Sequence, residues 1–343
     1  MRSFRFSGAL VGLLLATPAL RPAVADPPHA LRDFLATSGL SDSALGDLAD
    51  GHVVAGLLSP AVSHEIAVCG AVRVPAPAPR IVERIADATR VKTGTAIVAI
   101  GKFSSTPVID DVKAVRLLPP DVDALARCAR GRCDSKLAAL APEEFRRFDW
   151  SAPHAQARAE IVVRAGLVRY VSDYMARGDQ ALMDYRDVRH PVSLAREFHE
   201  LVEASPYLHE HAPELRRHLL ESPRLPEKGV ESYLYWATET FGLKPVLSVY
   251  HVASAMRADY TIVASKQIFA SRYFDTSLEM MAVARDPDSP VNEASYLWYI
   301  ARSRVDSLRG WLGRFKRGAI EKEARAAAVK MLTAARRACT PAP

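Results

Sequence analysis

Hydrophobic and polar positions divide the chain into a helical middle and a strand-rich later part. Between residues 231 and 304, β-branched and aromatic residues dominate, and short breaks such as Phe241-Gly242 and Ala258-Asp259 interrupt them. This pattern predicts five strands. They are expected near 231–240, 245–257, 260–269, 272–285 and 294–304. The short connections favour an antiparallel meander, because a parallel pair needs a long crossover.

The first third of the chain predicts a hairpin, a helix and one further strand. Residues 52–58 and 64–75 are rich in β-forming residues and are separated by a short turn segment, which predicts the hairpin. Residues 79–90 begin with proline and carry apolar side chains on one side, which predicts a helix. A strand is expected at 96–101.

Helical spacing governs the middle of the chain and its C-terminal end. Helices are expected over 153–177, 192–204 and 211–220, and a long helix with a narrow apolar stripe over about 314–338. The order of hairpin, helices, meander and long final helix predicts an α+β fold. We expect one domain from residue 26 onward, with 104–220 as a mostly helical insertion.

The first 25 residues have the pattern of a cleavable signal peptide. Arg2 and Arg5 precede an apolar run at 9–16, and Ala23-Val24-Ala25 forms a small-x-small cleavage site. The apolar run is far shorter than the roughly 20 residues that cross a bilayer. A buried N-terminal helix is the alternative interpretation. We therefore expect cleavage after Ala25 and a periplasmic or secreted protein.

The charge of the chain is modest and unevenly distributed. Its formal net charge of +6 includes Arg2, Arg5 and Arg21, so cleavage would leave +3. Such a small excess does not indicate a nucleic-acid partner. The stretch from Arg302 to Arg337 holds eleven Lys and Arg residues and three acidic residues. It predicts either a solvated helix surface or peripheral contact with anionic lipid head groups.

The four cysteines suggest a local disulfide. In an oxidising compartment, Cys128 and Cys133 are expected to pair across a glycine-containing turn. A metal half-site is the alternative, but the sequence has no second half with matching spacing, so no metal is expected. Cys69 lies in an apolar run and Cys339 near the C-terminal end. A pair between these two is left open.

Polar residues within the apolar strands are the candidates for a binding site, because a buried polar group needs a partner. Arg302 and Arg304 share a strand face and would suit a carboxylate or phosphate head group. The alternative is that these residues form structural ion pairs or face solvent. The candidate ligand-binding residues are Glu239, His251, Lys266, Gln267, Tyr273, Arg302 and Arg304, with Asp306 just past the strand end.

Two stretches resemble the START and polyketide-cyclase superfamily. They are AVCGAVRVPAPAPRIVERIAD at 67–87 and YLWYIARSRVDSLRGWLGRFKRGAIEKEARAAAVKML at 296–332. The resemblance implies a helix-grip fold, in which a curved antiparallel sheet wraps a long C-terminal helix and encloses an apolar, lipid-like ligand. The stretches GKFSSTPVIDDVKAV, FGLKPVLSVYHV and VASKQIFASRYFDTSLEM also resemble a group of uncharacterised exported bacterial proteins.

Familiar enzyme motifs do not occur in the sequence, which has no G-x-S-x-G, HExxH, Walker or GxGxxG pattern. No catalytic residue or cofactor is therefore assigned, and binding is favoured over catalysis. The sequence predicts a periplasmic binding or carrier protein for an apolar ligand. One alternative is an enzyme that uses Glu239, His251 or Lys266 as acid or base in the same cavity. The other is an envelope protein that meets anionic membrane through its basic C-terminal helix.

Overall fold

A computed structural model describes residues 29–340 except 39, 41–42, 93–95, 130–131, 189, 222–228, 241–243, 288, 290–292 and 312. The expected signal peptide at 1–25 lies outside the described residues. Across the helices that the structure describes, no segment combines the length and apolar character that a bilayer crossing requires.

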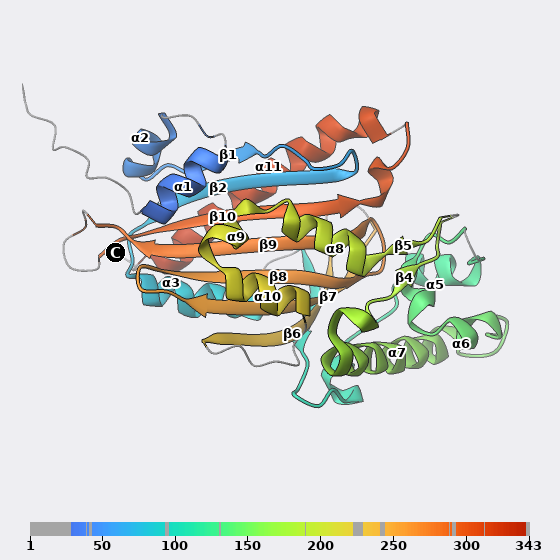
Figure 1. The fold of residues 1–343 in the computed structure, drawn as a ribbon. Helices are drawn as coiled ribbons and strands as arrows, with labels where there is room; N and C mark the ends of the chain where they lie inside the picture. The colour runs from blue at the N-terminus through green and yellow to red at the C-terminus, as the bar shows by residue number, and fades with distance from the viewer. Residues whose placement is uncertain are drawn as a thin grey trace, which may run out of the picture.

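A sheet of eight antiparallel strands forms the centre of the protein, in the order β1-β2-β10-β9-β8-β7-β6-β3 (Figure 1). The predicted hairpin and meander are confirmed. The strands are β1 (Val54–Leu57), β2 (Glu65–Val74), β3 (Ile97–Lys102), β6 (Val230–Glu239), β7 (Val246–Met256), β8 (Tyr260–Ala270), β9 (Phe274–Arg285) and β10 (Ser295–Val305). A separate short hairpin joins β4 (Asp184–Tyr185) and β5 (Val192–Ser193).

Helices cover both faces of this sheet (Figure 1). The predicted α+β fold with a long final helix is therefore confirmed at this level. One face bears α3 (Ala78–Ile85), α4 (Ala88–Val91) and α11 (Gly313–Cys339). The opposite face bears α1 (His29–Ser38), α2 (Ser43–Ala49), α8 (Leu194–Glu203), α9 (Pro206–His211) and α10 (Pro213–Glu221), while α5 (Pro119–Ala126), α6 (Pro142–Arg146) and α7 (Ala155–Arg177) pack at the β6–β7 end.

One predicted helix is divided in the structure, and one short helix is additional. The single helix expected over 79–90 is divided into α3 and α4, because Asp87 leaves the helical conformation and its carboxylate accepts a hydrogen bond from Thr89 N at 3.0 Å. The break that Ser205-Pro206 predicts between the helices at 192–204 and 211–220 is confirmed, because α8 ends at Glu203. Pro206 also opens the additional short helix α9, since proline fits the first turn of a helix, where its missing N–H costs nothing.

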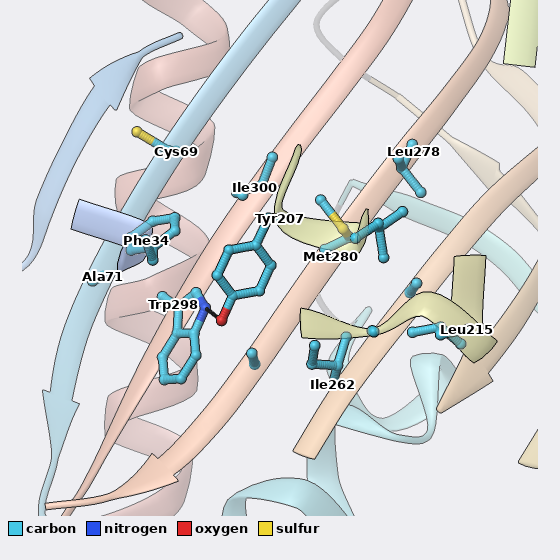
Figure 2. Close-up of a cluster of buried hydrophobic side chains, with 14 of the residues drawn as sticks. Phe34, Cys69, Ala71, Tyr207, Leu215, Ile262, Leu278, Met280, Trp298 and Ile300 are labelled. Atoms are coloured by element: carbon cyan, nitrogen blue, oxygen red, sulfur yellow. Dashed lines mark hydrogen bonds between the residues drawn. The ribbon is translucent and has the colours of Figure 1, made fainter. Parts of the chain in front are cut away.

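The face under α1 and α8–α10 is held by an aromatic core (Figure 2). Trp298 is 1% exposed and its indole N–H donates to the Tyr207 hydroxyl at 3.0 Å, while Phe34 lies beside both rings. Strand alternation places Trp298, Ile300 and Tyr296 on this face together. Because the indole N–H is satisfied, Trp298 can be buried here without leaving an unpaired polar group.

The C-terminal helix packs directly on β2. Ala328 and Leu332 are buried in the face that α11 turns toward the sheet. A Cβ at Gly70 of β2 would lie only 2.8 Å from Leu332 Cδ1, so glycine permits this close approach. The contact leaves no room for a ligand between α11 and this part of β2.

A disulfide joins Cys128 and Cys133, as the sequence predicts. The backbone N–H of Cys133 donates to the carbonyl oxygen of Asp187 at 3.0 Å, which ties this short loop to the β4–β5 connection. Cys69 and Cys339 are buried and are not joined to each other. The disulfide therefore braces the segment that carries Asp187.

Removing the disulfide should lower stability modestly. Closing such a short loop restricts the unfolded chain by only about 2 kcal/mol at 25 °C. We expect a Cys128→Ser/Cys133→Ser variant to lose roughly that free energy of unfolding in urea titrations. Reducing agent should produce the same change in the unmodified protein and no change in the variant. An equal effect of the reducing agent on the variant would contradict this assignment.

Candidate functional site

The strand register gathers charged residues at one end of the sheet. Glu65 opens β2 and pairs with Arg304 near the end of β10, and Arg304 in turn pairs with Thr276 near the start of β9. Because the strands are antiparallel, residues before β2, at the start of β9 and after β10 meet at the same sheet end. His64, Asp275 and Asp306 therefore come together although they lie far apart in the sequence.

A cleft of about 710 Å³ opens at this end of the sheet, and we call it the charged cleft. Its volume lies within the range of roughly 300–1,000 Å³ that is typical of small-molecule sites. The lining comes from the loop before β2, the β4–β5 loop, α8, β9 and the segment after β10. It comprises Ser63, His64, Asp187, Val188, His190, Pro191, Val192, Arg196, Glu197, Asp275, Asp306, Arg309 and Gly310.

A chain of hydrogen-bonded titratable and charged side chains crosses the wall of the charged cleft. His64 Nε2 lies 3.1 Å from Glu197 Oε2, and Arg309 Nη2 donates to Glu197 Oε1 at 2.7 Å. Arg309 also donates to Asp275 Oδ2 from Nε at 3.1 Å and from Nη2 at 2.8 Å. Burial alone would raise the pKa of Glu197, but its hydrogen bonds with His64 and Arg309 outweigh burial and lower that pKa to about 2.

Lys136 lies behind the cleft wall and holds three carboxylates of the lining together, Asp275 among them. Its Nζ donates to Asp306 Oδ2 at 2.8 Å and lies 3.8 Å from both Asp187 Oδ2 and Asp275 Oδ1. Burial raises the pKa of both Asp187 and Asp275, and nearby cations only partly offset that effect. The buried Oδ1 of Asp187 has no hydrogen-bond partner among the described residues. Nearby cations thus compensate the negative charge of these carboxylates only in part.

The two predicted arginines of β10 extend this network into the protein. Arg302 donates to Glu65, whose side chain is fully buried. Arg304 is also fully buried, and its guanidinium lies 3.5 Å from Glu65, 3.7 Å from Glu200 and 3.9 Å from Glu197. Carboxylates therefore surround the Arg304 guanidinium, which lies behind the His64–Glu197 pair. Neither arginine lines the charged cleft itself.

The groups in the charged cleft can bind cations and transfer protons. Four acidic side chains line it, against two arginines and two histidines. A histidine oriented by a carboxylate is a suitable proton acceptor, and a carboxyl group with a raised pKa is a suitable proton donor. Among the residues that the structure describes, no group of three or more His, Cys, Asp or Glu is arranged to hold a metal ion.

Glu239 and Gln267 lie away from the cleft, on the sheet face that bears α3, α4 and α11. They meet at Tyr250, whose hydroxyl donates to Glu239 Oε2 at 3.2 Å and accepts from Gln267 Nε2 at 3.3 Å. Lys92 Nζ lies 3.0 Å from Glu239 Oε1 and 4.7 Å from the Tyr250 ring centroid. We call this group the tyrosine face, together with Tyr235, which stacks on Tyr250 at 4.9 Å.

His251 and Lys266 lie on the opposite face and are completely buried. His251 Nδ1 lies 3.0 Å from the Tyr174 hydroxyl, and Lys266 donates to Asp179 and, at 2.8 Å, to the Leu219 carbonyl oxygen. Burial lowers the pKa of both His251 and Lys266.

Tyr273 occupies the β8–β9 turn with φ of 64°, and its carbonyl oxygen accepts from the Asp306 N–H at 2.9 Å. The structure thus brings Glu239 together with Gln267, and Arg302 together with Arg304, but it does not bring the seven predicted residues into one cavity.

Most residues of the charged cleft were not predicted from the sequence. The sequence indicates Asp306 because it follows the last strand, and the signal for Asp275 is a carboxylate within the apolar meander. Lys136, Asp187 and Glu197 lie in the helical middle, and only the folded chain brings them to the sheet end. No local pattern marks them.

Comparison with known proteins assigns no family. No protein-family model matches the chain, and no curated protein matches its sequence.

Proposed function

We propose that this chain is an exported binding protein that captures a small cationic or amine-bearing molecule in the charged cleft. The observation that carries the proposal is a cleft of about 710 Å³ with four acidic side chains in its lining. The signal-like pattern of residues 1–25 and the Cys128–Cys133 disulfide support export, since disulfides persist in oxidising compartments. The same features support a periplasmic or secreted location.

The balance of charged side chains in the charged cleft favours one class of ligand. Arg309 and Lys136 are already engaged by carboxylates, whereas Asp187 has a buried oxygen with no hydrogen-bond partner in the described part of the chain. An ammonium group would supply both the missing charge and several hydrogen-bond donors. Binding of this cation would favour the ionised forms of Asp187 and Asp275, whose pKa values burial raises. Ligand affinity should therefore weaken as these carboxyls become protonated.

A lipid-like ligand on the tyrosine face is the second candidate, and it corresponds to the helix-grip resemblance. Glu279, Met281 and Tyr299 occupy the middle of this face and remain partly exposed, although their neighbours on the other face are buried. The buried Gln267 Oε1 has no partner among the described residues. A polar head group could bind there, with the apolar part of the ligand beside α11.

Native mass spectrometry of protein isolated from its own host separates the two candidates. The charged cleft predicts a bound small polar cation whose mass adduct is lost in an Asp187→Asn variant and kept in Gln267→Ala. The tyrosine face predicts a lipid adduct with the reverse dependence. A lipid adduct that disappears only in Gln267→Ala would overturn the assignment to the charged cleft.

A further inference from the structure

Two large aromatic side chains at the start of α11 are exposed to solvent. Trp311 is 70% exposed and Phe315 is 68% exposed, and their ring centroids lie 6.2 Å apart in an edge-to-face arrangement. Aromatic residues of this size normally bury most of their surface in a folded protein. An adjacent exposed pair therefore calls for an external partner.

The charge around this pair is positive. Arg314, Lys316 and Lys322 are exposed, and the Arg314 guanidinium lies 4.9 Å from the Phe315 ring centroid. The acidic Glu321 is already paired, because it accepts a hydrogen bond from Arg317 at 3.0 Å. Glu323 is also exposed, but Arg314, Lys316 and Lys322 outnumber it, so the net charge next to the aromatic pair is basic and complementary to an anionic surface.

The outward side of α11 continues this surface along the helix. Helical spacing aligns Phe315 with Lys322 and Val329, at i, i+7 and i+14, and Val329 is 37% exposed. The opposite side carries the buried Ala328 and Leu332, which pack toward β2. The long stems of lysine can lie along an apolar layer while their ammonium groups stay in water.

We propose that Trp311, Phe315, Arg314, Lys316 and Lys322 form a docking surface for an anionic lipid bilayer. The two rings enter the interfacial layer, and the three cations contact the lipid head groups. The helix lies on the membrane surface and does not cross it. Arg309 and Gly310 line the charged cleft and immediately precede Trp311. Docking therefore holds the mouth of the cleft close to the membrane surface.

Vesicle binding by the intact chain tests this surface. We expect co-sedimentation with vesicles of phosphatidylglycerol and phosphatidylcholine, a blue shift of tryptophan fluorescence, and little binding to phosphatidylcholine alone. High salt should release the protein, since the attraction is screened. Trp311→Ala/Phe315→Ala and Lys316→Gln/Lys322→Gln should each weaken binding by at least about tenfold.

Matched controls make the result decisive. Ile161 is 64% exposed on α7, so Ile161→Ala removes a comparable exposed apolar side chain elsewhere. Lys113→Gln removes an exposed cation far from α11 in the sequence. Both controls should bind vesicles like the unchanged protein. Equal binding to neutral and anionic vesicles would overturn the proposal, as would full binding by a folded Trp311→Ala/Phe315→Ala variant. Self-association that depends on the aromatic pair without vesicle binding would instead indicate a protein interface.

Discussion

Replacing Glu65 with glutamine should lower the free energy of unfolding by about 3–5 kcal/mol. The Glu65 carboxylate is completely buried between Arg302 and Arg304, and it also accepts a hydrogen bond from Ala61 N at 3.2 Å. Glutamine keeps the shape but removes the charge that compensates two buried guanidinium groups. Urea denaturation followed by circular dichroism measures the loss.

Two comparisons separate this charge effect from a general sensitivity to substitution. Glu83→Gln alters an exposed glutamate that pairs with an exposed arginine, so it should change stability by less than about 1 kcal/mol. Glu65→Met/Arg302→Met removes both partners of a buried pair and should recover part of the stability lost in Glu65→Gln. Equal stability of Glu65→Gln and Glu83→Gln would contradict the network described above.

Glu197→Gln should cost on the order of 3 kcal/mol at pH 7, and the cost should shrink in acid. The hydrogen bonds with His64 and Arg309 lower the pKa of Glu197 to about 2 in the folded protein, from an ordinary value near 4.5. A lowered folded-state pKa contributes stability above the ordinary value, and this contribution is lost as pH falls from 4.5 toward 2. At pH 3, about 1 kcal/mol of this contribution to the free energy of unfolding should remain.

Denaturant titrations of both proteins between pH 7 and pH 3 measure this difference. Glu143→Gln is the matched control, because Glu143 pairs with Arg146 in an exposed position. Its stability should follow that of the unchanged protein at every pH. Glu197→Gln and the unchanged protein could instead differ in free energy of unfolding by the same amount at every pH down to 3. That result would rule out the ionic origin of the effect.

The sequence predicts the elements of this fold better than its site. Period-two alternation identifies β6 to β10, and helical spacing identifies α7 and α11, because each signal is contained in a single segment. The same alternation separates Gln267 from Lys266 onto opposite faces of β8, as the structure shows. It does not show which face is covered by which helices. Pairing of β3 with β6 is likewise set by the whole topology.

The charged cleft depends on contacts between distant segments. Lys136 reaches Asp306 across 170 residues, and His64 reaches Glu197 across 133 residues. Neither partner carries a local motif that identifies the other. The sequence indicates Arg302 and Arg304 as candidates because they are polar residues in an apolar strand. That reasoning finds buried charges, but it does not distinguish a binding site from the network behind it.

Calorimetric titration with 1,4-diaminobutane tests the central claim most directly, with 1,4-butanediol as the uncharged analogue. We predict saturable binding of the diamine at pH 7, none of the diol, and weaker diamine binding as the pH is lowered toward about 4. Asp187→Asn should weaken binding by at least about tenfold. Asp173→Asn, which alters an exposed residue of α7, should leave it unchanged. Failure of the diamine to bind, or equal affinity in the Asp187→Asn variant, would contradict a cation-binding charged cleft.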